Sequence, residues 1–268
     1  MLRVRPAAVA GRFYRKEPEG LAAQVDRLLS QAQPTHASAR PLRALIVPHA
    51  GYVYSAPIAA TAYSLLRRQA SRIRRVALLG PAHFTMVEGL ALPDADAFET
   101  PLGRVALDVD AMKRLQSMPQ VGVDPSAHAR EHALEVQLPF LQRLLGDLTL
   151  VPLVAGHAPA EQVAEVIDCL AVEGTFILVS SDLSHYLPYD EARPVDRATA
   201  RRIQQLQPVS WQDACGATPV NGLLAWAAAR GLSAAVLDLR NSGDTEGGKD
   251  SVVGYGAFAF EEGGSPAR

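Results

Sequence analysis

Residues 42–55 read LRALIVPHAGYVYS, an apolar run that leads directly into a proline and a histidine. Two later segments also place a histidine after an apolar run, VALLGPAH at 76–83 and FILVSSDLSH at 176–185. In each segment, four consecutive apolar residues precede the polar ones. A continuous apolar run of this length is typical of a strand that is buried on both faces. The three segments therefore predict a mainly parallel sheet that is covered by helices on both sides.

The rest of the chain alternates between strand and helix patterns. Apolar runs predict strands at Leu42–Val47, Val76–Gly80, Leu148–Val154, Thr175–Ser180, Ala234–Leu239 and Val252–Phe260. Helical patterns lie between them, at Glu19–Gln31, Pro57–Gln69, Glu131–Leu145, Pro159–Val172, Ala192–Leu206 and Pro219–Ala229. This alternation predicts an α/β fold, a three-layer α/β/α sandwich with a central mixed, mainly parallel sheet.

One segment, 86–107, interrupts the alternation with Pro93, Pro101 and Gly103. We expect it to form an insertion at the sheet edge, in which Arg104–Leu107 pairs with Gly89–Leu92. An insertion of this size does not require a second domain. We therefore expect residues 1–268 to form a single domain.

The composition narrows the class of protein. Apolar residues make up 48% of the 268, enough to bury a substantial core. The 26 basic and 28 acidic residues give a net charge of −2, and without a long basic block we expect no nucleic-acid partner. Apolar runs are too short for a bilayer and the N-terminus lacks a signal-peptide pattern, so we expect a cytoplasmic protein without a membrane partner. Without a P-loop or G-x-G-x-x-G motif, nucleotide cofactors are not expected.

Three of the seven histidines, His49, His83 and His185, follow a predicted strand. Ligands of open α/β sheets bind beyond the carboxyl ends of the strands, where these imidazoles converge if their strands are neighbours. Asp244, in a loop after Ala234–Leu239, can add a carboxylate. Two histidines and one carboxylate are typical of non-haem Fe(II) oxygenases, and they also accept zinc or copper. The alternative is that each histidine only caps or closes its own loop.

Two further pairs of residues are candidates for a functional role, although their sequence patterns are less specific. His132 and Glu135 are three residues apart and share one face of a predicted helix, which fits a substrate-binding role or plain helix electrostatics. Cys215 and Gly216 precede another predicted helix. A thiol near a helix N-terminus has a depressed pKa and can be nucleophilic. The spacing identifies no partner base for it.

Seven motifs together resemble the Memo family. They are RPAAVAGRFY at 5–14, PHAGYVYS at 48–55, GPAH at 80–83, EHALEVQLPF at 131–140, SSDLSH at 180–185, CG at 215–216 and NSGD at 241–244. The resemblance runs from about residue 5 to residue 260 in constant order. It implies a fold similar to class III extradiol ring-cleaving dioxygenases. The prokaryotic branch is named protein B of the AmmeMemoRadiSam system, which implies a functional link to the other proteins of that system.

The resemblance also implies roles for individual residues. His49 and His83 match two metal ligands, and His185 matches the histidine that acts as acid and base beside the metal. The third ligand is a cysteine in the animal Memo protein and a glutamate in the dioxygenases. This chain offers Thr245, a poor ligand, or Asp244 after a shift of one residue, and we select Asp244. The residues expected to shape the substrate pocket are Tyr52, Tyr54, His132, Glu135 and Cys215.

The function expected from this resemblance is a metal-dependent oxidoreductase that acts on a small aromatic or related substrate. Fe(II) is the first choice of metal, with copper and zinc as alternatives. His185 would take a phenolic proton and return it. One alternative is a non-catalytic adaptor that binds phosphotyrosine-type peptides in the same pocket, and another is a metal-dependent hydrolase. An intact ligand set favours chemistry, whereas a pocket closed by side chains favours binding alone.

Overall fold

The computed structural model describes residues 2–33 and 40–263 of the chain. Its strands are β1 (Val4–Arg5), β2 (Leu42–Val47), β3 (Arg75–Pro81), β4 (Leu90–Leu92), β5 (Ala97–Thr100), β6 (Gly103–Leu107), β7 (Val121–Val123), β8 (Thr149–Ala155), β9 (Thr175–Ser180), β10 (His185–Leu187), β11 (Leu232–Asn241) and β12 (Val252–Glu262). The main path through the sheet runs β1-β5-β6-β8-β3-β9-β2-β12-β10, and β11 also pairs with β12.

The sheet is mixed and mainly parallel at its centre. Strands β6, β8, β3, β9 and β2 are parallel neighbours, and β12 pairs antiparallel with both β2 and β11. The central strands are buried on both faces, as their continuous apolar sequence predicts: Ile46, Leu78 and Leu178 are all fully buried. The predicted sheet type is therefore confirmed.

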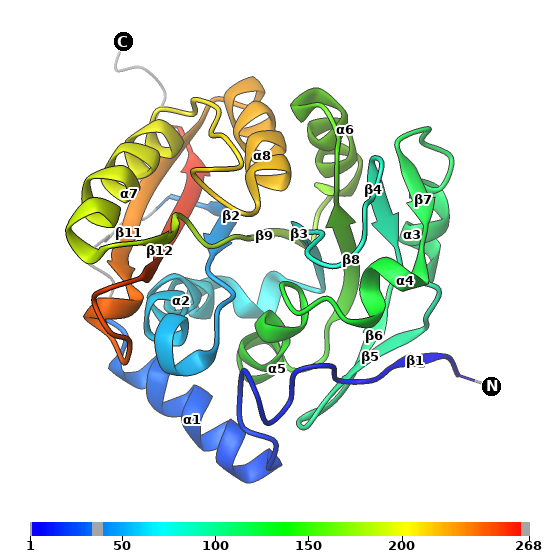
Figure 1. The fold of residues 1–268 in the computed structure, drawn as a ribbon. Helices are drawn as coiled ribbons and strands as arrows, with labels where there is room; N and C mark the ends of the chain where they lie inside the picture. The colour runs from blue at the N-terminus through cyan, green and yellow to red at the C-terminus, as the bar shows by residue number, and fades with distance from the viewer. Residues whose placement is uncertain (1, 34–39, 264–268) are drawn as a thin grey trace.

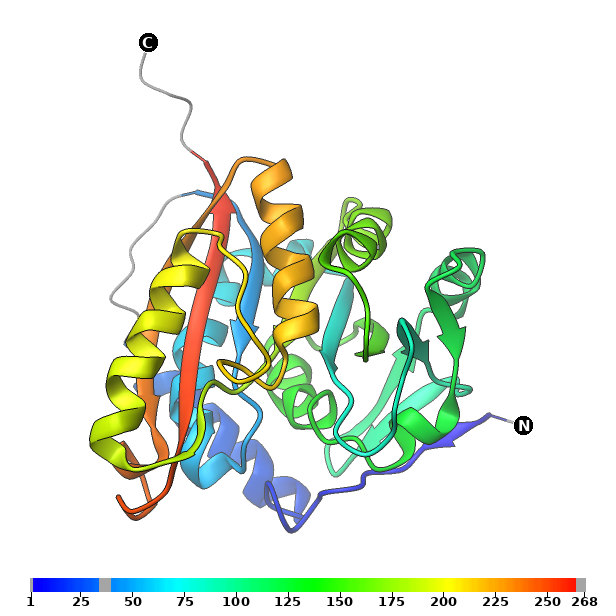
Figure 2. The same cartoon turned by 45° about the horizontal axis from the view of Figure 1, so that its top comes forward.

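Helices cover both faces of this sheet. They are α1 (Pro18–Gln31), α2 (Tyr52–Leu66), α3 (Val109–Leu115), α4 (Pro125–Ala129), α5 (Leu138–Leu145), α6 (Ala160–Leu170), α7 (Tyr189–Gln204) and α8 (Ala217–Ala229). Figure 1 shows α6, α7 and α8 on one side of the sheet and α1, α2 and α5 on the other, and the turned view in Figure 2 keeps these two layers apart. The predicted three-layer sandwich is confirmed. Among the described residues, no helix combines the length and apolar character needed to cross a bilayer.

The insertion lies at the sheet edge, but its predicted pairing is wrong. β6 pairs antiparallel with β5, whereas β4 pairs with β7 and β8. The cause is the tight turn between Thr100 and Gly103, which are paired in register. Gly103 adopts a φ of 112°, which favours glycine, and the Thr100 hydroxyl accepts a hydrogen bond from Leu102 N at 3.0 Å. This turn joins β6 to the strand directly before it.

The predicted helix Glu131–Leu145 begins later than expected. A short 3₁₀ turn, η2 (Glu135–Gln137), precedes α5, which starts only at Leu138. Pro139 occupies the first turn of α5, where a missing N–H costs no intrahelical hydrogen bond. Residues 131–134 instead form a loop, in which Ala133 N donates to the Glu131 carboxylate and Arg5 donates to the Glu131 carbonyl. This loop reaches the end of the sheet described next.

A buried ion pair ties the N-terminal segment to η2. The fully buried Glu135 carboxylate pairs with Arg5 and accepts hydrogen bonds from Tyr14 Oη at 2.6 Å, Ala8 N at 2.7 Å and Val9 N at 3.0 Å. A buried carboxylate is tolerated only when its lone pairs are satisfied in this way. Glu135 is therefore a structural residue that holds the chain start against the 131–137 loop.

Candidate metal centre

The carboxyl ends of three neighbouring parallel strands form the floor of one cleft. β9 lies between β3 and β2, and His49, His83 and His185 follow β2, β3 and β9 respectively. The ring centroids of His49 and His83 are 5.1 Å apart with nearly perpendicular planes. All three histidines line a cleft of about 1250 Å³. The convergence expected from the sequence is present in the structure.

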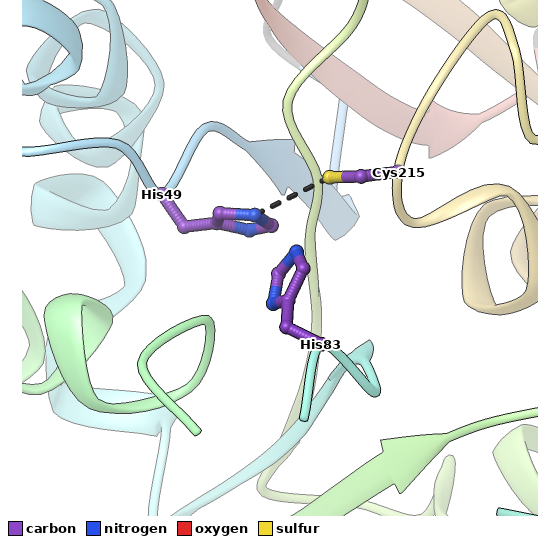
Figure 3. Close-up of side chains that lie close together, drawn as sticks. All are labelled: His49, His83 and Cys215. Atoms are coloured by element: carbon purple, nitrogen blue, oxygen red, sulfur yellow. Dashed lines mark hydrogen bonds between the residues drawn. The ribbon is translucent and has the colours of Figure 1, made fainter. Parts of the chain in front are cut away.

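A thiol joins the two imidazoles from a distant part of the chain. Cys215 lies in the segment before α8, and its Sγ atom is 3.3 Å from His49 Nε2, as drawn in Figure 3. Donor atoms of His49, His83 and Cys215 all lie within 4.8 Å of one another. Two donors on one tetrahedral zinc ion stand about 3.5 Å apart, given ordinary metal–nitrogen and metal–sulfur distances. The trio is therefore compact enough to hold a metal ion.

His49 is held by both its backbone and its ring. Its backbone N donates to Asp182 Oδ1 at 2.7 Å, and its Nδ1 lies 3.0 Å from Ser180 Oγ. The residue is only 2% exposed. Burial, and then the neighbouring charge that His83 can carry, lower the pKa of His49 to about 3. The ring is therefore neutral at physiological pH, which is the state that binds metals.

Glu131 holds His83 in the same manner. Its Oε1 lies 2.8 Å from His83 Nδ1 and accepts from Ala133 N at 2.8 Å, while its Oε2 accepts from His83 N at 2.8 Å. Burial raises the pKa of Glu131, but the hydrogen bonds from His83 and the two backbone amides outweigh it and lower the pKa to about 2. An ionised carboxylate on Nδ1 fixes the ring orientation and leaves Nε2 as the free donor.

A second trio of donors, His83, Glu131 and His132, also lies within 4.8 Å. The Glu131 oxygens already accept the hydrogen bonds just described, so this carboxylate orients His83 rather than contributing a further ligand. The His132 ring stacks on His83, with centroids 4.6 Å apart and planes at 22°. Burial and the neighbouring His49 lower the pKa of His132 to about 4. His132 lines the cleft as a neutral wall.

Two more groups face the same cleft. The Nδ1 atom of His185 lies 2.8 Å from the Leu183 carbonyl, which can only accept, so Nδ1 carries the proton and Nε2 has a lone pair. Asp182 Oδ2 lies 3.9 Å from His49 Nε2, and burial raises the pKa of this carboxyl. The sequence reasoning missed Asp182, although it stands three residues before His185 at the end of a buried strand.

Asp244, predicted as the third ligand, is not brought to the histidine pair. It ends the 3₁₀ turn η3 (Ser242–Asp244), where its Oδ2 accepts from Asn241 N at 3.0 Å and its Oδ1 accepts from the Tyr189 hydroxyl. It lines a separate cavity beside Arg193 and Arg240. Its carboxylate is used to close its own turn, which is the behaviour of an Asx residue in a loop.

The predicted pocket residues divide into two groups. Tyr54, His132 and Cys215 line the cleft. Glu135 instead lies in the N-terminal ion pair, and Tyr52 is 4% exposed with its hydroxyl donating to the Val136 carbonyl at 2.7 Å. Tyr52, the first residue of α2, is therefore packed in the core against η2.

Known proteins match this chain over nearly its whole length. The family model described as Memo-like protein matches residues 5–259. A MEMO1 family protein of Aquifex aeolicus is 34% identical over 97% of this chain and 100% of its own length. A MEMO1 family protein of Sulfolobus acidocaldarius is 36% identical over 96% of this chain and 99% of its own.

A solved structure shares the fold. The crystal structure of uncharacterized protein JW3007 from Escherichia coli K12 superposes with a TM-score of 0.51 over 81% of this chain and 99% of that one. Its sequence is 16% identical, so the likeness concerns the fold alone. The family match and the similarity to relatives extend over nearly the whole chain, including each motif that supplies the cleft. The chain therefore belongs to the Memo family.

Proposed function

We propose that this protein binds one divalent transition metal through His49, His83 and Cys215 and uses it as an oxidoreductase. The observation that carries the proposal is the mutual approach of the three donor atoms within 4.8 Å. Imidazole and thiolate donors suit iron, copper and zinc, and the resemblance to extradiol dioxygenases favours Fe(II). Bound there, the metal would supply Lewis-acid chemistry and, as iron or copper, redox chemistry.

The residues around the metal donors supply proton transfer. The Nδ1–H of His185 is anchored on the Leu183 carbonyl, so its Nε2 can accept a proton from a substrate hydroxyl and return it later. Asp182 accepts a hydrogen bond from the His49 backbone N–H, and its other carboxyl oxygen lies 3.9 Å from His49 Nε2. These residues follow β2 and β9, whose relative position is fixed by their pairing in the sheet.

The cleft fits a planar substrate. Aromatic rings of Phe13, Tyr54, Trp211 and Tyr255 line it together with the histidines. Its volume of about 1250 Å³, above the roughly 300–1000 Å³ typical of small-molecule pockets, leaves room for such a molecule. We therefore propose a small aromatic or related molecule as the substrate, seated between these rings above the metal donors.

A ligand-binding protein is the second candidate function. Tyr186 and Trp211 both line the cleft and are 77% and 78% exposed, so the cleft has aromatic groups that face solvent. Exposed aromatic side chains beside a cavity are typical of recognition surfaces. They suit a peptide ligand that extends beyond the cleft, and such a ligand would be bound without turnover.

Metal analysis tests the proposed function. Protein purified without chelators or a nickel column should contain about one iron, copper or zinc ion per chain. The metal should be lost in His49→Ala, His83→Ala and Cys215→Ala, and it should be retained in the matched cleft variant Tyr54→Phe. Stoichiometric metal that survives all three ligand substitutions would place the site elsewhere and overturn the proposal.

A further inference from the structure

We infer that Ser180 is a positioning residue that fixes which nitrogen of the His49 ring carries the proton, and that Gln137 fixes the direction of the hydrogen bonds around Ser180. The inference rests on the proposed metal function and names the groups that prepare His49 for it. Ser180 and Tyr63 are fully buried and Gln137 is 1% exposed, so no water is needed to explain their contacts.

The orientation of the Gln137 amide is set by a backbone carbonyl. Its Nε2 atom lies 2.9 Å from the Pro48 carbonyl oxygen, which can only accept a hydrogen bond. The amide nitrogen must therefore be on this side, and Oε1 accepts from the Tyr63 hydroxyl at 2.9 Å. The second amide N–H is directed to Ser180 Oγ at 2.8 Å. Gln137 thus donates to Ser180 and cannot accept from it.

The Ser180 hydroxyl has one proton, and a second carbonyl uses it. Ser180 Oγ lies 2.6 Å from the Ala133 carbonyl oxygen, which again can only accept. Two oxygen lone pairs at this distance would repel, so the Ser180 proton lies between them. With its proton given to Ala133 and one lone pair facing Gln137, Ser180 presents only a lone pair to its third neighbour.

That third neighbour is the His49 ring. Its Nδ1 atom lies 3.0 Å from Ser180 Oγ, and a contact of this length with a lone pair requires a proton on Nδ1. The Nε2 atom then keeps its lone pair, which faces Cys215 Sγ at 3.3 Å. The hydrogen-bond network therefore makes His49 a ready ligand through Nε2 before any metal arrives.

Ser180 does for His49 what Glu131 does for His83. Both rings donate Nδ1–H to a buried acceptor, but one acceptor is an ionised carboxylate and the other is a neutral hydroxyl. A neutral hydroxyl can reverse its direction, whereas a carboxylate cannot. Gln137 and the Ala133 carbonyl remove this freedom, which explains why a buried amide belongs beside the serine.

The experiment reads the tautomer directly in the metal-free protein. Nitrogen-15 NMR of histidine-labelled chain at neutral pH distinguishes a protonated ring nitrogen from one with a free lone pair, and the His49→Ala variant assigns the signals. We expect His49 to show protonated Nδ1 and unprotonated Nε2. Protonated Nε2 in the wild-type protein would overturn the inference, and this measurement requires no other variant to fold.

Substitution of Ser180 provides the second arm. In Ser180→Ala the buried Nδ1–H has no acceptor, so the proton should move to Nε2, and metal affinity should fall by roughly 10–100-fold, as for other partners of ligand histidines. Ser180→Thr retains the hydroxyl and should retain the wild-type tautomer. The matched control is Ser55→Ala, which removes another buried hydroxyl that donates to a backbone carbonyl, that of Ala50, without touching a histidine ring.

The two proposals fail in different ways. If the wild-type tautomer is Nδ1–H but the protein binds no metal, the metal function is wrong and the role of Ser180 stands. If metal binding depends on His49 while Ser180→Ala keeps both the tautomer and the affinity of the wild type, the role of Ser180 is wrong and the metal function stands.

Discussion

The Sγ atom of Cys215 lies 3.3 Å from Nε2 of His49, although 166 residues separate the two in the sequence. His49 is placed by the end of β2 and Cys215 by the start of α8, so the contact depends on packing between the sheet and a helix layer. Both atoms can act as metal donors, and they lie within hydrogen-bond distance of each other. This contact brings a thiol into the group of donors that could hold a metal ion.

Replacing Cys215 by Ala should weaken metal binding by more than about 100-fold, because partners that only orient a ligand are already worth roughly 10–100-fold. Asp244→Ala should bind metal as the wild type does, since Asp244 closes its own turn. Metal content after dialysis against limiting Fe(II) measures both. Metal loss in Asp244→Ala but not in Cys215→Ala would reverse the ligand assignment.

Replacing His185 by Ala should leave metal content near that of the wild type and reduce dioxygen-dependent turnover by roughly 10²–10⁴-fold, the usual worth of a general acid–base group. His185 lines the cleft but is not among the three mutually close donors. Oxygen consumption and metal content measured on the same preparation check this. Loss of metal in the variant would instead identify His185 as a ligand.

Replacing Glu131 by Gln should lower metal affinity by roughly 10–100-fold, because an amide replaces the charged acceptor that holds the His83 ring and its backbone N–H. The control is Glu99→Gln, which neutralises an exposed glutamate paired with Arg104. Competition with a metal-binding dye gives both affinities. Equal affinities for the two variants would argue that His83 needs no carboxylate.

Replacing Glu135 by Ala should lower the free energy of unfolding by about 3–5 kcal/mol, since it leaves Arg5 buried without its partner. The matched control, Asp26→Ala, breaks an exposed ion pair with Arg143 and should cost about 1 kcal/mol or less. Urea unfolding of the metal-free chains measures the two losses. Similar losses in both variants would mean that the buried pair contributes little.

The free energy of unfolding should decrease as the pH falls from neutral to acidic values, and His128 should account for part of this decrease. Burial is the main cause that lowers the pKa of His128 to about 4, and the positive charge of Arg5 lowers it further. Its hydrogen bond to the Ala91 carbonyl and the nearby carboxylates of Glu131 and Asp124 act in the opposite direction but are weaker. The unfolded chain, with an ordinary histidine pKa of about 6.5, therefore binds more protons between these two values, and stability is lost as pH falls through that window.

The His128→Gln variant isolates this contribution. Between pH 7 and pH 4.5 the wild type should lose about 2 kcal/mol more unfolding free energy than the variant does. Paired urea titrations at the two pH values give the difference, so the other titrating groups cancel. Parallel pH dependence in both chains would show that His128 does not titrate on unfolding.

The strands and the histidine pair could be predicted from the sequence because local signals determine them. The apolar run 42–47 is a strand with the predicted bounds, and a strand that ends in Pro48 must deliver His49 to the sheet edge. The same reasoning holds for His83. Neither position depends on contacts between distant segments beyond the parallel pairing itself.

The third donor could not be predicted in this way. Cys215 is brought to the cleft by the packing of α8, and loops before helices carry no periodic signal that fixes their direction. Asp244 fits the ligand chemistry, but its carboxylate closes a turn that only three-dimensional contacts reveal. The prediction that a helix begins at Glu131 is wrong for a similar reason. The Glu131 carboxylate accepts from the backbone N–H of His83 and the Glu135 carboxylate from that of Ala8, and these distant contacts hold a loop.

The buried pair of Arg5 with Glu135 has a consequence for the order in which the chain folds during synthesis. Tyr14 also bonds to Glu135, and 121 residues separate these two in the sequence. At the usual ribosomal speed of about 5–20 residues per second, the segment that contains Arg5 and Tyr14 waits roughly 6–24 s for its partner to be made. These contacts, and with them the loop that positions His83, can therefore become fixed only after Glu135 has been made.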